Sequence, residues 1–408
     1  MNGGFVMSEK YLVINGGSSS LKFSLYEMPS EEMIAKGYIE KIGSEDSFWN
    51  IKYNGENIGG ASYLKDHSDA VKVMVSELVK NKIINDMNEI KGIGHRVLHG
   101  GEIYSESVKI TDKVLDDIIN LTNLGPLHHP GEVAGIKAMQ ECLPDTIQVA
   151  VFDTAFHQTM TRENFIYAVP YEWYTKYKVR RYGFHGTSHK YITSVMQEKL
   201  GKKDVNLIIC HVGSGASITC VKSGKSLDTS MGLTPLDGLV MGTRSGSIDP
   251  SIIKFIVDET GMSLDEVLNQ LNKNSGLKGI CGKNDFRDVI ELISKGDKQA
   301  QLAYDVFMDS IIKHIAEYYF ELDGNVDAVV FTAGVLENNA ALREKIVNKL
   351  SGPMRVVLDN DTNNNIGYGH DLKFGVITSK ESQIPIYVIP TDEEVMIVRD
   401  TYNIVKCL

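Results

Sequence analysis

The sequence predicts an α/β protein built from two similar lobes, and three observations lead to this fold class. Short apolar strand patterns alternate with helical stretches along the chain. A glycine-rich hairpin near the N-terminus occurs a second time near the middle of the chain. The 408 residues are enough for two domains with large buried cores.

Each hairpin consists of a buried strand pattern, a glycine-rich turn and a second strand. The two sets are Tyr11–Ile14, Asn15–Ser20 and Leu21–Tyr26, and Leu207–Cys210, His211–Ala216 and Ser217–Val221. In both turns a polar residue is followed two positions later by Gly and then by Ser. Such a turn offers backbone N–H groups that no side chain shields, which suits phosphate; a plain β-turn is the alternative. The repetition favours two related lobes.

The remaining segments complete the α/β pattern. Helical patterns occur at Ala70–Asn81, Lys190–Leu200, Ser263–Leu271, Asp288–Ser294 and Gln299–Phe320, and strand patterns at Gln148–Phe152 and Ala328–Thr332. Ser263 and Glu266 have the spacing of a capping box. No linker or low-complexity segment marks a boundary, so the repeat alone places the end of the first lobe near Phe152.

Composition excludes several classes of protein. The net charge is −11, which argues against nucleic acid as a main partner. No apolar run reaches the ~18 residues that span a bilayer, and no secretory signal is visible, so we expect a cytoplasmic protein without a membrane partner. The odd number of cysteines, without metal spacing, fits reduced thiols. Asn2-Gly3-Gly4 can be encoded by a purine-rich ribosome-binding sequence, so we expect the natural chain to begin at Met7.

Polar residues gather after apolar strands in five clusters, which are Gly94–Gly101, Leu127–Pro130, Val149–His157, Tyr182–His189 and Met241–Gly246. Their histidines match no zinc spacing. Arg96 and Arg244 in glycine-flanked loops, Asp153 at a strand end and His185 between Phe and Gly indicate anion chemistry. The alternative for each arginine is a surface ion pair, for Asp153 a turn or helix cap, and for His185 a structural role. Structural roles are assigned to the remaining histidines His99, His129, His157 and His189.

Ten motifs occur along the chain, and they are VINGGSSSLKFSLYE, GHRVLHGG, PLHHP, VFDTAFHQTM, RRYGFHGTSHKY, HVGSGAS, LDTSMGLTPLDGLVMGTRSGSIDPSI, KNDFRD, FTAGVLENN and IPTDEEVMI. Together, at these separations, they resemble the acetate/propionate kinase family of the sugar kinase–Hsp70–actin superfamily. The resemblance implies two ribonuclease H-like lobes with the active site in a cleft between them. It places residues 7–153 and about 388–408 in an acetate and Mg²⁺ lobe, and residues 154–387 in a nucleotide lobe. It also implies a homodimer.

The resemblance implies a role for each matching residue. Asn15 and Glu393 hold Mg²⁺, with Mn²⁺ as an alternative, and Ser18, Ser20 and Lys22 face the transferred phosphoryl group. Arg96 binds the acetate carboxylate, Asp153 is the catalytic acidic residue, His185 and Arg244 stabilise the transition state, and His128 lies near the same oxygens. The residues that bind ATP are His211, Val212, Gly213, Ser214, Gly215, Asp285, Phe286, Arg287, Gly334, Val335, Leu336, Glu337 and Asn338.

The chemistry of acetate phosphorylation agrees with these roles. Acetate is ionised at pH 7, so no general base is needed, and the obstacle is repulsion between acetate and phosphate. Cations must offset this repulsion, and Asp153 then serves as a ligand or positioning group rather than a proton acceptor. Leu98, Leu127, Phe184 and Pro235 are expected to surround the acetate methyl group. Leu98, where the family usually has Val, narrows this pocket and favours acetate over propionate.

Departures from the family pattern are concentrated on the nucleotide side. They are Ser214 for Asn, His129 for Asn, Ser247 for Asp, Leu336 for Gly and Asp392 for Asn. We expect reversible transfer from ATP to acetate, giving acetyl phosphate and ADP. Leu336 either packs away from the nucleotide or fills its space. Other donors (pyrophosphate or another nucleotide), propionate as acceptor and a non-catalytic nucleotide switch remain alternatives.

Overall fold

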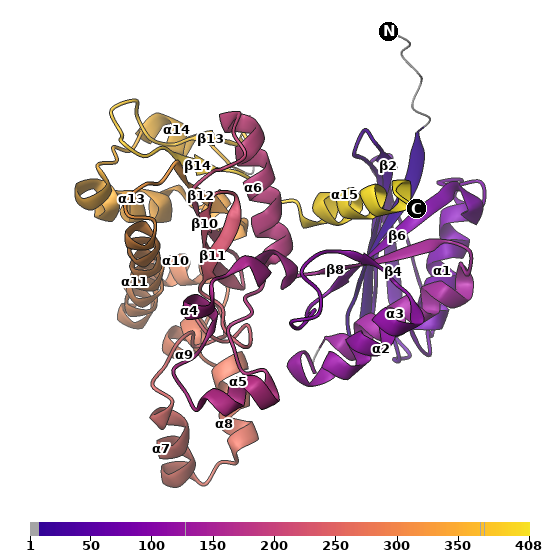
Figure 1. Ribbon diagram of the computed structural model, residues 1–408, viewed down its shortest axis with the longest axis horizontal. Coiled ribbons are helices and arrows are strands. Elements are labelled where there is room, and N and C mark those ends of the chain that lie inside the picture. Colours follow the sequence, from indigo (N-terminus) through magenta and orange to yellow (C-terminus); the bar gives the residue numbers. More distant parts are fainter. Residues whose placement is uncertain (1–7, 127, 368, 371) are drawn as a thin grey trace. The chain divides into compact units, whose positions relative to one another are not determined.

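The computed structural model describes residues 8–126, 128–367, 369–370 and 372–408, so the expected start at Met7 lies outside the described residues. The chain divides into two compact units (Figure 1). Unit 1 runs up to Ala155 and includes Asp392–Leu408, and unit 2 is Phe156–Thr391. The sequence analysis places these boundaries at residue 153 and near residue 388.

Unit 1 contains a mixed β-sheet. Its strands are β1 (Glu9–Gly16), β2 (Ser20–Met28), β3 (Glu32–Glu40), β4 (Phe48–Tyr53), β5 (Glu56–Ala61), β6 (Ile90–Val97), β7 (Val108–Lys109) and β8 (Ile147–Phe152). Among the described residues they lie in the order β5-β4-β3-β2-β1-β6-β8-β7. The strands β1 to β5 form an antiparallel meander, and β6 and β8 run parallel to β1.

Helices cover both faces of this sheet (Figure 1). They are α1 (His67–Lys80), α2 (Asp112–Asn120), α3 (His129–Cys142) and α15 (Glu393–Lys406), with short 3-10 helices at Met87–Glu89 and Leu121–Leu124. Leu12 and Ile14 of β1 belong to the core that includes α1 and α3. Tyr11 points to the other face, because side chains alternate along a strand. Its ring packs edge-on against the ring of Tyr402 in α15, with the two ring centroids 5.4 Å apart. The C-terminal helix therefore folds back onto the first sheet.

Unit 2 repeats the strand order of unit 1. Its strands are β9 (Leu207–Val212), β10 (Ala216–Lys222), β11 (Lys225–Thr229), β12 (Ala328–Thr332), β13 (Gly375–Val376) and β14 (Ile386–Val388). In the described part of unit 2 they lie in the order β11-β10-β9-β12-β14-β13, which matches β3-β2-β1-β6-β8-β7 in both order and strand direction. The two glycine-rich hairpins occupy equivalent places, so the predicted pair of α/β lobes is confirmed.

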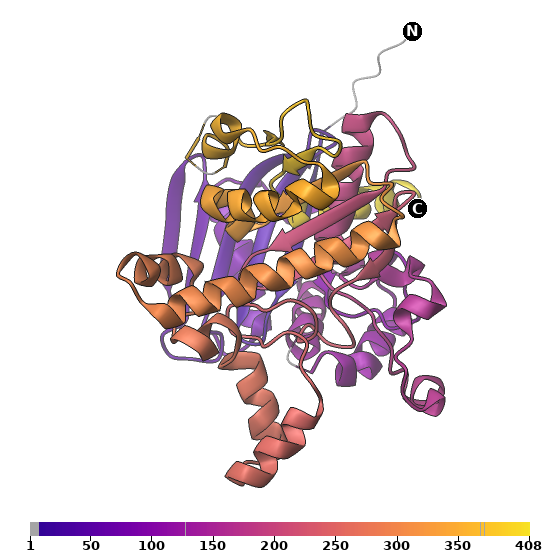
Figure 2. The same cartoon turned by 90° about the vertical axis from the view of Figure 1, so that its left-hand side faces the viewer.

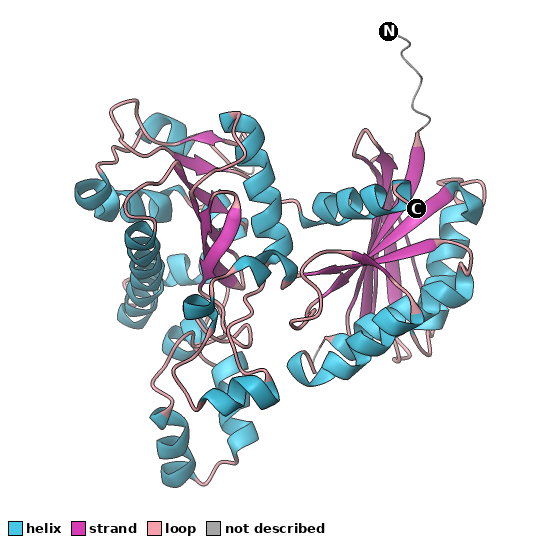
Figure 3. Cartoon of the chain, viewed as in Figure 1, coloured by secondary structure: helices cyan, strands magenta, loops and turns pink. Residues whose placement is uncertain are grey.

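The helices of unit 2 are more numerous. They are α4 (Arg162–Phe165), α5 (Tyr171–Tyr177), α6 (Gly186–Leu200), α7 (Ser251–Thr260), α8 (Leu264–Lys273), α9 (Gly276–Cys281), α10 (Phe286–Ser294), α11 (Lys298–Glu321), α12 (Gly334–Asn338), α13 (Ala340–Met354) and α14 (Asn360–Asn364), and the 3-10 helix Ala155–Thr159 lies at the unit boundary. Figures 1 and 3 show α6 and α11 on opposite sides of the sheet. The long helix α11 is seen at full length in Figure 2.

Most predicted elements occur at the expected places, with shifted ends. The helix expected from Lys190 begins at Gly186, so His189 lies inside a helix rather than in a loop. The capping box is confirmed: Ser263 Oγ accepts from Glu266 N at 3.2 Å, and Ser263 N donates to Glu266 Oε2 at 2.7 Å. All five cysteines are free thiols. None of the described helices combines the length and apolarity needed to cross a membrane.

Candidate active site

Polar side chains of unit 1 gather at the carboxyl ends of three parallel strands. Asn15 lies near the end of β1, Arg96 near the end of β6, and Asp153 directly after β8. Because β6 pairs in parallel with both β1 and β8, these ends lie at one edge of the sheet. Open α/β sheets bind their ligands at this edge.

The glycine-rich turn between β1 and β2 is held against α3. Gly17 N donates to the Ser20 carbonyl at 2.8 Å, and His67 Nε2 donates to the Gly17 carbonyl at 2.8 Å. A Cβ on Gly131 of α3 would lie 2.4 Å from the Gly17 carbonyl, so this contact requires glycine. The side chains assigned to the phosphoryl group are exposed or half-buried on this turn and on β2: Ser18, Ser20 and Lys22.

Arg96 and Asp153 form a preformed ion pair. Arg96 Nη2 donates to Asp153 Oδ2 at 2.5 Å, and the side chains are 18% and 2% exposed. Burial alone would lower the pKa of Arg96, but Asp153, Glu132 and Glu393 outweigh it and raise this pKa. Arg96 therefore stays charged in a cluster that contains these three carboxyl groups.

Glu393 lies at the first position of α15, where the C-terminal segment returns to unit 1. Burial raises its pKa well above the ordinary range, the charge of Asp153 adds to this rise, and Arg96 opposes it. Asp392 caps the helix by accepting from Val395 N at 2.9 Å, and Glu394 accepts from Ser24 Oγ at 2.6 Å. The pKa of Glu393 is thus influenced by the charges of both Asp153 and Arg96.

The donor chemistry of this edge fits Mg²⁺. Within the described ranges, no group of three His, Cys, Asp or Glu side chains has the arrangement of a metal cage. Mg²⁺ usually binds through one or two carboxylates plus phosphate and retains several waters, so a cage of protein ligands is not required. Asn15 and Glu393 supply hard oxygen donors, and a divalent cation would offset the repulsion between Glu393 and Asp153.

In unit 2, His185 and Arg244 converge above the turn between β9 and β10. A Cβ on Gly215 would lie 3.5 Å from both His185 Nε2 and Arg244 Nη1. His185 has a φ of 56°, which is rare for a residue with a side chain, so the surrounding structure holds it in place. Its ring stacks on His211 at 4.2 Å.

Arg244 is a half-buried cation without a counter-ion in the described part of the chain. Its Nη1 has weak contacts with the Pro235 carbonyl at 3.4 Å and with Met241 Sδ at 3.5 Å. Burial lowers its pKa, and no carboxylate in the described ranges opposes this shift. A partly desolvated guanidinium in this state suits an incoming anion.

The residues expected around the acetate methyl group are mostly buried. Leu98 follows β6 and is 4% exposed, and Phe184 is 2% exposed. The Phe184 carbonyl accepts from His157 Nε2 at 3.0 Å. Pro235 is half-buried beside Arg244, and His128 is the N-cap of α3. Leu127 lies outside the described residues.

A cavity of about 510 Å³ in unit 2 collects most residues expected to bind ATP. The expected residues that line it are Gly213, Ser214, Asp285, Phe286, Arg287, Gly334, Val335 and Asn338. The lining residues that sequence reasoning missed are Gly242, Leu277, Asn284, Phe307 and Asn339. Five expected residues do not line the cavity: His211, Val212, Gly215, Leu336 and Glu337. Two of them, His211 and Gly215, lie beside His185.

Leu336 packs away from this cavity. It is fully buried in α12, whereas Gly334 and Val335 of the same helix line the cavity. The positive φ that glycine favours occurs at Ala333, with φ 66° and ψ 161°, and not at Leu336. Of the two alternatives for Leu336, the structure therefore supports packing away from the nucleotide, because the side chain is fully buried.

A model of the acetokinase family matches residues 10–399. The chain belongs to the acetokinase family. It is 49% identical over 400 residues to the acetate kinase of Bacillus subtilis (strain 168), which covers 97% of this chain and 100% of that protein. The family resemblance drawn from the ten motifs is thus confirmed.

Two solved structures of family members share the fold. The acetate kinase of Porphyromonas gingivalis has a TM-score of 0.92 at 40% identity and covers 97% of this chain and 100% of its own. A propionate kinase from Francisella tularensis has a TM-score of 0.90 at 43% identity, and the match covers 97% of this chain and 99% of that chain. The fold class is therefore that of the acetokinase family over nearly the whole chain.

In this family member, Glu132 is a site residue that the sequence reasoning missed. It lies in the first turn of α3 and is 2% exposed. Its Oε1 accepts from Leu98 N at 3.1 Å, and its Oε2 has no hydrogen-bond partner. Burial raises its pKa to about 8, although Arg96 opposes the shift. The signal in the sequence was an acid directly after the PLHHPG motif, at the start of a helix.

Arg343 is a second missed residue, and it supports the nucleotide cavity from behind. Its guanidinium is buried and donates to the carbonyls of Leu336 (2.8 Å) and Glu337 (2.7 Å), at the end of α12. Its Nε donates to Asn363 Oδ1 at 2.8 Å. Arg343 therefore ties α12, which carries Gly334 and Val335, to α13 and α14.

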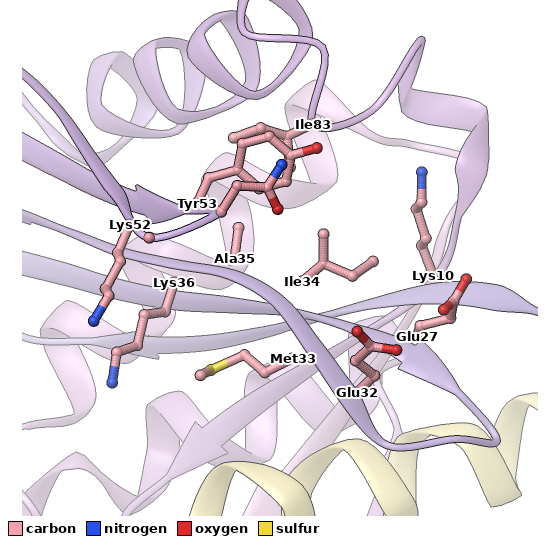
Figure 4. A pocket seen from close by; sticks show the side chains of 12 residues that line it. Lys10, Glu27, Glu32, Met33, Ile34, Ala35, Lys36, Lys52, Tyr53 and Ile83 are labelled. Atoms are coloured by element: carbon pink, nitrogen blue, oxygen red, sulfur yellow. The ribbon is translucent and has the colours of Figure 1, made fainter.

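A separate cavity of about 580 Å³ in unit 1 lies along β3 and β4 and contains none of the expected site residues. Figure 4 shows Lys36 and Lys52 side by side, extending away from Ile34 and Ala35. The two lysines are direct partners in the β3–β4 register, an arrangement of like charges that destabilises a strand pair.

Proposed function

We propose that this family member catalyses reversible, Mg²⁺-dependent transfer of the γ-phosphoryl group of ATP to acetate, giving acetyl phosphate and ADP. The observation that carries the proposal is the convergence of Arg244 and His185 above Gly215, in a place where Arg244 has no carboxylate partner among the described residues. A desolvated cation and a ring N–H at one point suit a phosphoryl group that gains charge during transfer.

The proposed division of roles follows the charge balance. Arg96, kept charged by its carboxylate neighbours, binds the acetate carboxylate, and Leu98, Leu127, Phe184 and Pro235 surround the methyl group. Lys22, Ser18 and Ser20 face the transferred group together with His128. Asp153 orients Arg96 through the 2.5 Å contact and takes no proton, because acetate is already ionised.

Mg²⁺, or Mn²⁺ in its place, would be held by Asn15 and Glu393 and would offset charge on the phosphate oxygens. The desolvated carboxyl group of Glu393 supports this assignment, because its ionised form needs a cation. Glu132 is protonated near pH 7, so Arg96 alone faces the carboxyl groups of Asp153 and Glu393, and a second positive charge there is electrostatically favoured.

ATP is the proposed donor because the cavity of unit 2 is open. Leu336 is buried away from it, and Gly213 and Gly334 allow the nucleotide close to the backbone. His211, Val212, Gly215 and Glu337 would support the lining residues without touching this space. We further propose a nucleotide lobe in unit 2, an acetate lobe in unit 1, a homodimer, and a cytoplasmic location.

A hydroxamate assay for acyl phosphate tests the proposal and its alternatives together. Wild-type protein is incubated with acetate or propionate and with ATP, GTP or pyrophosphate, each with Mg²⁺ and with EDTA. We expect most product with acetate, ATP and Mg²⁺. Robust product with pyrophosphate but not with ATP would show that pyrophosphate is the phosphoryl donor. A preference for propionate would show that propionate is the acceptor. No product with any donor would leave the non-catalytic nucleotide switch as the remaining alternative.

A further inference from the structure

One hydroxyl group in unit 2 lies between His185, which is half-buried, and His189, which is fully buried. Ser217 Oγ is 2.9 Å from His185 Nδ1 and 2.8 Å from His189 Nε2. Ser217 and His189 are both fully buried. A hydroxyl has a single proton, so Ser217 donates to at most one of these rings and accepts from the other.

Two neutral arrangements satisfy both contacts. In the first, His189 Nε2–H donates to Ser217, and Ser217 donates to His185 Nδ1, which leaves the proton of His185 on Nε2. In the second, His185 Nδ1–H donates to Ser217, and Ser217 donates to His189 Nε2. The second arrangement puts a bare lone pair on His185 Nε2 and a proton on His189 Nδ1.

The surroundings of His189 select the first arrangement. His189 Nδ1 is buried and has no hydrogen-bond partner, so a proton there would be an unsatisfied donor in the interior. His189 is also neutral near pH 7, because burial and the neighbouring rings of His157, His211 and His185 lower its pKa well below 6.5. The ring therefore carries one proton, on Nε2, where Ser217 accepts it.

We propose that Ser217 and His189 are positioning residues that hold His185 in the tautomer with its proton on Nε2, the nitrogen that converges with Arg244. The inference rests on the proposed function, since an N–H at this point helps a phosphoryl anion and a lone pair repels it. It gives His189, which the sequence assigned only a structural role, a part in preparing the site.

Backbone and ring contacts hold the side chain of His185 in place. The left-handed φ of 56° fixes the residue, and His157 holds the preceding carbonyl of Phe184 at 3.0 Å. The ring stacks on His211 at an angle of 24°. With orientation set by these contacts, the hydrogen bond from Ser217 to Nδ1 places the ring proton on Nε2.

The direct test is ¹⁵N-histidine NMR of the full-length protein, in which long-range ¹H–¹⁵N spectra distinguish protonated from bare ring nitrogens. His185→Gln assigns the signals. We expect a bare Nδ1 and a protonated Nε2 for His185 in the wild type, and a mixture of tautomers in Ser217→Ala. A bare Nε2 in the wild type overturns the proposal, whatever the activity.

Kinetics give an independent test with a matched control. In Ser217→Ala we expect kcat to fall about 10- to 100-fold with KM for acetate little changed, and Ser217→Thr, which keeps the hydroxyl, to retain more activity. Ser47→Ala is the control: Ser47 is another fully buried serine, it lies in unit 1, and its Oγ donates to the carbonyls of Ser44 at 2.6 Å and Lys41 at 2.8 Å. It should lose similar stability but keep kcat and the His185 signals.

A double-mutant cycle separates positioning from general disruption. Adding Ser217→Ala to His185→Gln should reduce kcat by less than twofold, because Ser217 acts through the ring that is already absent. An additive loss, or an unchanged kcat in Ser217→Ala, overturns the proposal. Failure of the proposed function has a different signature, since the wild type itself would then form no acetyl phosphate.

Discussion

Arg96 and Asp153 form an ion pair at 2.5 Å, whereas Arg244, the second arginine of the candidate site, has no carboxylate partner within the described residues. The two arginines were equivalent in the sequence, because both were expected in glycine-flanked loops; Arg96 instead lies in β6. In the folded protein they differ in kind: Arg96 is part of a balanced cluster of charges, and Arg244 is an uncompensated cation. Their substitutions should therefore have different consequences.

Arg244→Ala should lower kcat/KM by an amount that corresponds to about 3–4 kcal/mol of lost transition-state stabilisation. The substitution removes a hydrogen-bond donor to the phosphoryl oxygens, on which charge develops during transfer. Its free energy of unfolding should stay near the wild-type value, because a partly buried cation without a counter-ion contributes little to folding. Arg244→Lys should recover little activity, since the planar fork is lost. Steady-state kinetics and urea unfolding of the same preparations check both expectations.

Arg96→Ala should lose both activity and stability. It leaves Asp153 buried and without its Arg96 contact beside Glu132 and Glu393, and breaking one partner of a buried pair typically costs about 3–5 kcal/mol. Arg399→Ala, which disrupts a half-exposed pair with Glu31, is the matched control and should keep kcat/KM. Equal stability losses in the Arg96 and Arg244 variants would contradict the distinction between them.

Glu132→Gln should change the pH dependence of stability. The folded-state pKa of about 8 lies above the ordinary 4.5, so the stability linked to this proton is fully present below pH 4.5 and is lost as pH rises through 8. Glutamine cannot ionise, and its side-chain oxygen can still accept from Leu98 N. The variant should therefore gain stability over wild type at pH 8.5 relative to pH 5.5.

Urea unfolding at the two pH values measures this gain. Glu344→Gln serves as the control, since Glu344 is exposed, and it should show the same difference from wild type at both pH values. A stability difference for Glu132→Gln that does not grow between pH 5.5 and pH 8.5 would show that Glu132 is not held in its protonated form.

Leu98→Val should raise the kcat/KM ratio of propionate to acetate. Removing one methylene opens room beside the acetyl methyl group, and a methylene in such a pocket is worth about 1–3 kcal/mol. Leu115→Val, at a buried leucine of the α2 core, controls for general loosening and should leave the ratio unchanged. An unaltered ratio in Leu98→Val would remove Leu98 from the acyl pocket.

Leu336→Gly should destabilise the protein without strengthening ATP binding. Leu336 is buried away from the nucleotide cavity, so its removal opens no space there, and the cavity left in the core costs about 2–5 kcal/mol of stability. Ala333→Gly is the comparison variant. Glycine adopts the φ of 66° at this position without strain, so the free energy of unfolding should rise by about 1 kcal/mol. Tighter ATP binding by Leu336→Gly, measured by calorimetry, would contradict this placement.

The sequence identified the two hairpins and the polar residues at strand ends, because both depend on local patterns. Asn15, Arg96 and Asp153 follow apolar strands, and parallel pairing then brings strand ends together. The repeat of glycine-rich turns likewise carried the two-lobe prediction, which rests on chain order and needs no knowledge of side-chain packing.

Glu132 and Leu336 could not be placed from the sequence, since their environments arise from tertiary packing. An acid in the first turn of a helix is ordinarily exposed, and only the packing of α3 against β1 and β6 buries Glu132. Leu336 was judged by the residue it replaces, whereas its direction is set by α12, which Arg343 anchors. The start of α6 at Gly186 was missed because His185 adopts a left-handed conformation that residue type does not reveal.

The most direct test of the central claim is ³¹P NMR of the protein with acetate, ATP and Mg²⁺. The account predicts that acetyl phosphate and ADP signals grow together at the expense of ATP, and that EDTA or Arg244→Ala suppresses both. Release of inorganic phosphate without acetyl phosphate, or no change in the ATP signals, would contradict it.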